Sequence, residues 1–157
     1  MGTPVGVYLQ EEGWKIPELA SLCEDENFVT SYRMLNEWWL LASDNGLTSL
    51  FDFVSSSEKL QEECKQTFAI SREEALILGW SHEEYDAHDL GCERVEPEVW
   101  FVPEDGLAAT RALLQHIWRE YPIVEHEFWD VEFLEDLVRL LEAAARHGIR
   151  FHLSVGG

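Results

Sequence analysis

The stretch Asp130–Gly156, DVEFLEDLVRLLEAAARHGIRFHLSVG, carries both periodicities on which the fold depends. Its first part repeats apolar residues in steps of three and four, which places them on one face of a helix. Its last part alternates apolar and polar residues from Ile149 to Val155, as a strand does. Asp130 stands at the expected N-cap, and Gly148 follows two basic residues where a helix would end. The stretch therefore predicts an amphipathic helix that leads directly into a strand.

Two more strands and several more helices are predicted upstream. Val5–Gln10 is a short β-branched run, and Glu98–Pro103 is a continuous apolar run that suits a strand buried on both faces. Because strands are scattered among helices, the sequence predicts an α+β fold, a small central sheet of about three or more strands surrounded by several helices. A single domain, residues 1–157, is expected from the length. The predicted helices cover residues 17–24, 30–42, 57–68, 71–80 and 103–121.

The two adjacent tryptophans of the 30–42 helix are predicted to differ in environment. Trp38 and Trp39 follow one another, so on a helix their side chains point about 100° apart. One of them can lie in the core while the other lies at its rim. Core packing is favoured for Trp38, and the sequence leaves Trp39 undecided.

The charge limits the kinds of partner. The chain has 31 Asp and Glu against 11 Lys and Arg, a net charge of −20. Nucleic-acid backbones and anionic membranes attract cationic surfaces, so neither is expected as a partner. A basic protein partner, met rapidly and in a salt-sensitive way, fits better. The alternative is that the acidity serves solubility alone.

The N-terminus and the cysteines favour a cytoplasmic protein. MGTPVGVYLQEEG has no basic region before its short apolar run, so we expect no signal peptide. The three cysteines are odd in number and widely spaced, which indicates free thiols in a reducing compartment.

The stretch Ser81–Glu93, SHEEYDAHDLGCE, has the highest concentration of side chains that could bind a metal or take part in catalysis. Glu84, His88 and Cys92 are four residues apart, so a helix could place these three potential metal ligands on one face. Two observations oppose a metal site: Ser81 and Glu84 form a capping box, and Gly91 would end the helix before Cys92. A capped, solvated helix is the better interpretation, and we expect no metal and no cofactor.

No catalytic residue can be assigned from the sequence. A G-x-S-x-G nucleophile motif and a phosphate-binding glycine loop are both missing from the sequence. The acids around the cysteines would raise a thiol pKa rather than activate it. Carboxylate pairs are so numerous that none stands out as a catalytic pair. The sequence therefore favours a non-enzymatic function.

A second concentration of acids lies between Glu120 and Asp136, with seven carboxylates and no Lys or Arg. Aromatic residues interleave with them, a pattern typical of an anchor and rim for a basic partner. The alternative is that Trp129 and Phe133 are core residues next to a helix start. The predicted partner-binding residues are Glu125, Glu127, Trp129, Asp130 and Glu132, with Glu83, Asp86 and Asp89 on the other acidic helix.

The element order resembles that of the YfbM-like family of uncharacterised bacterial proteins. The residues that carry the resemblance are the opening MGTPVGVYL and, in the last 60 or so, PEVWFVPEDGLAATRALLQHI, EHEFWD, EAAARHG and IRFHLSV. Residues of roughly 20–95 do not take part. The resemblance implies a compact α+β domain and supplies no catalytic residues.

Three functional hypotheses remain. The first is an acidic protein-binding module, in its most concrete form an immunity or inhibitor protein that blocks a basic toxin or nuclease. The second is an enzyme or small-molecule binder with a site near His152, Arg150 and the Glu125–Asp130 loop. The third is a structural domain whose acidity serves solubility. Charge complementarity favours the first.

Overall fold

A computed structural model describes residues 3–10, 15–23, 28–56, 70–93 and 97–156, except the side chains of residues 23 and 88–93. The chain groups into two compact units. Unit 1 consists of residues 1–55 and 99–157, and unit 2 of residues 56–98. The expected single domain stays a prediction, and each unit is described by itself below.

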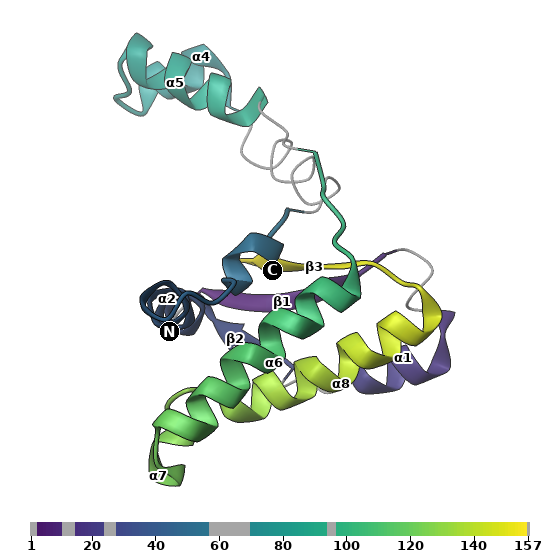
Figure 1. Ribbon diagram of the computed structural model, residues 1–157. Coiled ribbons are helices and arrows are strands. Elements are labelled where there is room, and N and C mark those ends of the chain that lie inside the picture. The colour runs from purple at the N-terminus through teal and green to yellow at the C-terminus, as the bar shows by residue number, and fades with distance from the viewer. Residues whose placement is uncertain (1–2, 11–14, 24–27, 57–69, 94–96, 157) are drawn as a thin grey trace. The chain divides into compact units, whose positions relative to one another are not determined.

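Unit 1 is built on a three-stranded antiparallel sheet with the order β2-β1-β3 (Figure 1). The central strand β1 (Pro4–Leu9) pairs with β2 (Thr30–Ser31) on one side and β3 (Phe151–Val155) on the other. Val7 lies opposite Leu153 in this register, so the apolar side chains of both strands share one face. The helices of unit 1 cover that face, which confirms the α+β prediction.

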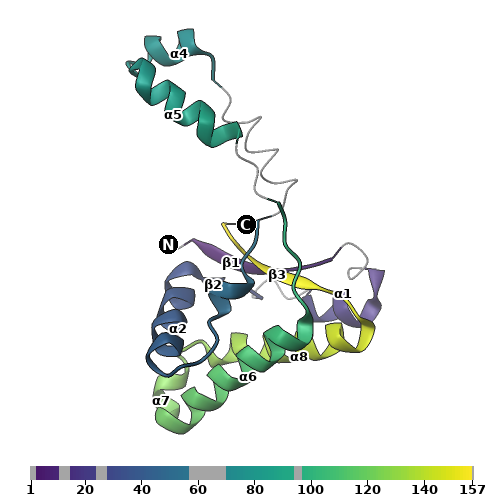
Figure 2. The same cartoon turned by 45° about the horizontal axis from the view of Figure 1, so that its top comes forward.

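Four helices pack on the sheet and on one another. They are α1 (Pro17–Cys23), α2 (Tyr32–Asp44), α6 (Pro103–Glu120) and α8 (Val131–His147). Figures 1 and 2 show α6 and α8 side by side, with α1 against the later part of α8. Gly106 permits a close approach of α6 to β3, because a Cβ there would lie 2.3 Å from Phe151 Cζ. Replacing Gly106 by any larger residue therefore requires the Phe151 ring or α6 to move.

The predicted boundaries of α6 and α8 are confirmed, and Asp130 stands at the predicted N-cap position of α8. Pro103 begins α6, and α8 ends at His147 with Gly148 in the left-handed region at φ 67°. Asp130 occupies the N-cap position of α8 but makes no side-chain cap hydrogen bond. Its backbone is itself left-handed, with φ 52° and ψ 47°, so its carboxylate is directed elsewhere.

The tryptophan pair of α2 separates as predicted. Trp38 is 1% exposed and belongs to the core, whereas Trp39 is 45% exposed. The indole Nε1 of Trp38 donates a hydrogen bond of 3.0 Å to the carbonyl oxygen of Trp129. Core burial of Trp38 therefore also ties α2 to the segment that precedes α8.

The predicted strand over Glu98–Pro103 reduces to one bridge. Phe101 exchanges two backbone hydrogen bonds with Phe151, of 2.8 and 3.1 Å. The Val99 amide instead donates to Ser55 Oγ at 2.8 Å, and Pro103 already begins α6. Too few residues remain between these two points for a ladder. The third strand is β2, which at two residues is too short for a period of two to appear in the sequence.

The hydrogen bond between Val99 and Ser55 also marks where unit 1 is interrupted. The Ser55 amide donates to the Leu153 carbonyl at 2.9 Å, so both crossing points are fixed beside β3. Residues 56–98 therefore begin and end at neighbouring positions of unit 1. A 3₁₀ helix, η2 (Leu50–Phe53), precedes the first crossing.

In its described residues, unit 2 contains the helices α4 (Arg72–Ile77) and α5 (His82–Glu93). Ser71 caps α4, because its Oγ accepts from the Glu74 amide at 3.2 Å. The predicted helix over residues 57–68 lies outside the described residues. Over the parts of the chain that the structure describes, every helix is too short or too polar to cross a membrane.

Candidate interaction surface

The predicted acidic loop contains a short helix, α7 (Ile123–His126), between α6 and α8. Proline cannot continue a helix and disfavours helical backbone in the residue before it. Tyr121 is accordingly extended, with φ −124° and ψ 140°, and α6 stops before Pro122. The chain then makes one turn of helix and reverses into α8, so α7 joins the adjacent ends of α6 and α8 (Figure 1).

The inner side of this segment is anchored in the core. Trp129 is 9% exposed, and its ring lies 5.0 Å from that of Tyr121. Phe133, 4% exposed, stacks on Trp38 and on Phe28. The predicted surface anchor at Trp129 is therefore corrected: its side chain is a core residue, as is that of Phe133.

Asp130 supports the same segment from the other side. Its carboxylate accepts a hydrogen bond of 2.8 Å from Thr30 Oγ1 on β2. A residue other than glycine at positive φ is uncommon, although Asp tolerates it better than most. The hydrogen bond between Thr30 and this half-buried carboxylate helps to fix the position at which α8 begins.

The outer side of the segment exposes apolar side chains that the sequence analysis missed. Ile123 and Val124 are 84% and 86% exposed, and Phe128 is 52% exposed. Glu125 and Glu127 are exposed between them. The signal was present in the sequence PIVEHEF, because a helix of one turn after a proline cannot bury two adjacent branched side chains on one face.

A hollow of about 420 Å³ lies beside α7. Acidic side chains dominate its lining, and Lys and Arg take no part in it. The indole of Trp118, on α6, is 48% exposed there. An aromatic face with several carboxylates attracts the ammonium or guanidinium group of a Lys or Arg side chain. The lining residues are Trp118, His126, Glu127, Asp130, Val131, Glu132 and Glu135.

The arginines next to this region pair with the acids at its two ends. Arg119 lies 3.3 Å from Glu120, and Arg139 pairs with Asp136 one turn into α8. Among the described residues, the acids between these ends make no salt bridge. The region is therefore both apolar and strongly negative. We call it the α7 surface: Trp118, Ile123, Val124, Glu125, Glu127, Phe128, Glu132 and Glu135.

A second hollow, of about 570 Å³, mixes charges. Arg119 and Glu120 both line it, and they are ion-paired. The other lining residues are Asn45, Leu47, His116 and Tyr121. This hollow offers a cationic ligand no charge advantage.

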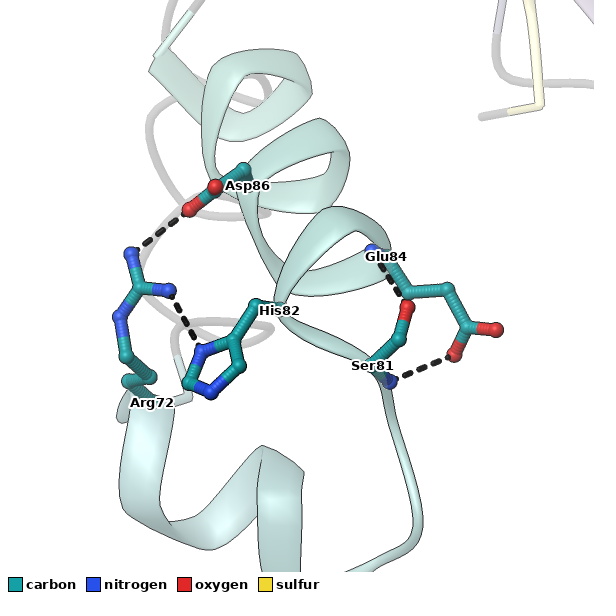
Figure 3. A network of polar contacts seen from close by, with 5 residues as sticks. All are labelled: Arg72, Ser81, His82, Glu84 and Asp86. Atoms are coloured by element: carbon teal, nitrogen blue, oxygen red, sulfur yellow. Dashed lines mark hydrogen bonds and ion pairs between the residues drawn. The ribbon is translucent and has the colours of Figure 1, made fainter.

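The other three predicted partner residues lie on α5 in unit 2, a separate unit from the α7 surface. Glu83 is exposed. Asp86 accepts a hydrogen bond of 2.6 Å from Arg72 on α4, so its charge is already paired (Figure 3). The side chain of Asp89 lies outside the described residues.

The capping box predicted for α5 is confirmed. Ser81 Oγ accepts from the Glu84 amide at 3.0 Å, and a Glu84 carboxylate oxygen accepts from the Ser81 amide at 3.3 Å (Figure 3). His82 faces Arg72 across the helix pair at 3.1 Å. Glu84 thus serves the helix start, and the side chains of His88 and Cys92 lie outside the described residues. Where the structure describes side chains, no cluster of three His, Cys, Asp or Glu could hold a metal ion.

The residues of the hypothetical small-molecule site are not brought together. His152 on β3 is fully buried, 5.3 Å from the ring of Tyr8 and 4.6 Å from that of Trp100. The Glu125–Asp130 segment instead contacts β2 through Thr30, and β1 separates β2 from β3 in the sheet. Arg150 is exposed just before β3.

Comparison of the chain with protein-family models, with curated proteins and with solved structures finds no match. The resemblance to the YfbM-like family stays a prediction that rests on element order and a few residue types.

Proposed function

We propose that the protein is a cytoplasmic, non-enzymatic binding module that takes a basic protein partner on the α7 surface. Its most concrete form is an immunity or inhibitor protein. The carboxylates would occupy the cleft in which a basic toxin or nuclease otherwise holds phosphates. The observation that carries the proposal is the exposure of Ile123 and Val124, 84% and 86%, within an acidic surround.

Burial of apolar area stabilises a fold, and these two side chains contribute almost nothing of that kind. A partner that covers them would remove their apolar area from water, at roughly 25 cal/mol per Å². Interfaces commonly have such an apolar centre and a polar rim. The core beneath, through Trp129 and Trp38, holds the segment in place before binding. A fixed segment loses little conformational entropy when the partner arrives.

The carboxylates of the α7 surface favour a partner with positive charge. Glu125 and Glu127 flank the exposed apolar side chains, and Glu127 also lines the hollow with Glu132 and Glu135. A Lys or Arg of the partner that enters this hollow meets carboxylates and the Trp118 ring together. Charge of this kind mainly accelerates association, whereas buried apolar contacts slow dissociation.

The first experiment removes the apolar centre. A partner is captured from a lysate of the source cells at low salt and purified, and its binding kinetics are measured. Ile123→Ser with Val124→Ser is expected to speed dissociation at least about tenfold, or ~1.4 kcal/mol. Because both side chains are over 80% exposed, the melting temperature should stay within error of the wild type. Unchanged dissociation from a folded variant would contradict the proposal.

The second experiment reverses the charge of two acidic residues beside the apolar centre. Glu125→Lys with Glu127→Lys is expected to slow association at low salt and to flatten its dependence on ionic strength. The matched control, Glu73→Lys with Glu104→Lys, makes the same charge change at two exposed acids outside the α7 surface. If the control slows association equally, net charge and not the α7 surface attracts the partner.

A further inference from the structure

One face of α2 is exposed and carries no charge. Five side chains fall within an arc of about 100° on the helix. Trp39 and Leu40 lie near the middle of α2 along its axis, at the two edges of this arc, and are 45% and 49% exposed; Tyr32 is 41% exposed. The complete arc is Tyr32, Asn36, Trp39, Leu40 and Ser43, and all five are exposed.

An uncharged face is unusual in a chain of net charge −20. A basic partner would gain little from it, because it offers no carboxylate. Two copies of this chain, by contrast, repel one another wherever their acids meet. They can approach closely only through surfaces that lack acids. The face of α2 therefore fits a second copy of the chain better than it fits a basic protein.

Two charges beside this face are arranged for a two-fold contact. Arg33 and Asp44 are exposed, one near each end of α2. They are eleven residues apart, about 16 Å along the axis, so they cannot pair within one helix. In an antiparallel contact of two α2 helices about their midpoint, each Arg33 lies opposite the partner copy's Asp44. A two-fold axis makes this opposite-charge contact twice.

Arg33 is also available for such a contact. Five other arginines, Arg72, Arg111, Arg119, Arg139 and Arg146, each pair with an acid. Among the described residues, Arg33 makes no salt bridge, nor do Lys15 and Arg150. Asp44 is likewise unpaired in the described part of the chain.

We propose that a second copy of this chain docks on the exposed face of α2, through an antiparallel contact between the two α2 helices. A helix of 13 residues is about 20 Å long, so the contact buries less than the ~1,200 Å² of a stable complex. The dimer is therefore weak, with a dissociation constant on the order of 10–100 µM. This surface is separate from the α7 surface, and the dimer does not depend on the proposed function.

Salt distinguishes the two surfaces. Screening weakens the attraction between the α7 surface and a basic partner. It also weakens the repulsion between two copies of −20, so self-association through an uncharged face should strengthen with salt.

The test is sedimentation velocity of the full chain from about 5 to 300 µM, at about 0.05 and 0.5 M salt, which spans the expected constant and the screening range. The expected result is a mass that rises toward two chains with concentration, and rises further at high salt. A mass of one chain under all these conditions overturns the proposal. It would also mean that α2 is free or is covered by another part of the same chain.

The variants locate the contact. Trp39→Glu, and separately Leu40→Glu, should weaken dimerisation at least about tenfold, because each puts a carboxylate at the centre. Val124→Glu adds the same charge on the α7 surface and should leave the dimer unchanged. Melting curves establish that each variant is folded. An equal loss with Val124→Glu would overturn the location on α2.

A charge exchange tests the antiparallel geometry. Arg33→Asp alone and Asp44→Arg alone should each weaken the dimer about threefold to tenfold. The double variant Arg33→Asp/Asp44→Arg should recover wild-type dimerisation, because opposite charges then face one another again. A double variant weaker than both single variants overturns the antiparallel arrangement.

Discussion

Unit 1 and unit 2 use different interactions to hold their helices. In unit 1, buried side chains from β1, β3, α1, α2, η2, α6 and α8 form one core. In unit 2, Ala75 is the one buried side chain among the described residues 70–87. There, Arg72 holds the two helices through Asp86, His82 and the ring of Tyr85, all at the surface.

The difference indicates where the stability of the chain lies. Exposed ion pairs contribute about 0–1 kcal/mol each, whereas a buried leucine contributes several times more. Unit 1 therefore carries most of the free energy of folding. The chain passes from unit 1 to unit 2 after Ser55 and returns to unit 1 at Val99, and these two residues are hydrogen-bonded to each other. The predictions below test this division.

The largest expected effect is at Leu153. Its side chain is 1% exposed in the middle of β3. Leu153→Ala should lower the free energy of unfolding by about 4 kcal/mol, within the 2–5 kcal/mol range of buried leucines. Leu78→Ala in unit 2, where the side chain is 67% exposed, is the matched control and should change it by less than about 0.5 kcal/mol. Denaturant unfolding of both variants measures the contrast, and equal losses would remove the distinction between the units.

The next largest effect is at Trp129. Trp129→Ala should cost about 3 kcal/mol, because it removes a 9% exposed ring that packs against Tyr121 and Phe128. Binding by the fraction that remains folded should stay close to wild type, since the exposed contacts are elsewhere. Thermal melting and binding kinetics on this one variant give both values. A stable variant with fast dissociation would restore Trp129 as a surface anchor.

Removal of unit 2 should have a smaller effect. Residues 56–98 are replaced by a short Gly/Ser linker, which the hydrogen bond of 2.8 Å between Ser55 and Val99 permits. Unit 1 should still unfold cooperatively, within about 1 kcal/mol of the full chain. A molten or insoluble product would support the single domain predicted from the sequence.

The smallest effect is a pH dependence at the contact of α1 with α8. His147 and then Arg146, both hydrogen-bonded to Glu18, hold the pKa of this carboxyl below its ordinary value near 4.5. A lowered folded-state pKa stabilises the fold above the unfolded pKa, and that contribution is lost as the pH falls through the folded value. Glu18→Gln should therefore melt slightly below wild type at neutral pH and together with it at acid pH. The opposite order would mean that this contact does not stabilise the fold.

The sequence predicted the elements with strong periodicity and missed those decided by tertiary contacts. The stripe of α8, the alternation of β3 and the capping box of Ser81 and Glu84 are local patterns, and all three were predicted correctly. Whether Glu98–Pro103 forms a strand ladder depends on Ser55, whose Oγ accepts a hydrogen bond from the Val99 amide. Asp130 occupies the predicted N-cap position, but its carboxylate accepts a hydrogen bond from Thr30, a hundred residues earlier, and makes no cap hydrogen bond.

The sequence shows the acids of the candidate surface but not which apolar residues are exposed among them. Seven acids without a base are visible in the sequence and place the surface between Glu120 and Asp136. Which apolar residues are exposed depends on α7, a helix too short to show a period. Trp129, which the sequence suggested as a surface anchor, is buried, and its carbonyl oxygen accepts a hydrogen bond from Trp38 of α2. The adjacent aliphatic residues Ile123 and Val124 are exposed instead.

The register of the sheet affects how the chain can fold during its synthesis. Val5 of β1 lies opposite Val155 of β3, so the central strand must wait for nearly the whole sequence before its longest partner exists. At the ~5–20 residues per second of synthesis, this delay lasts on the order of 10–30 s. During that time the apolar row of Val5, Val7 and Leu9 has only the two-residue β2 beside it. Such a distant pairing also slows folding itself, so β1 is the strand that stays unpaired longest while the chain is made.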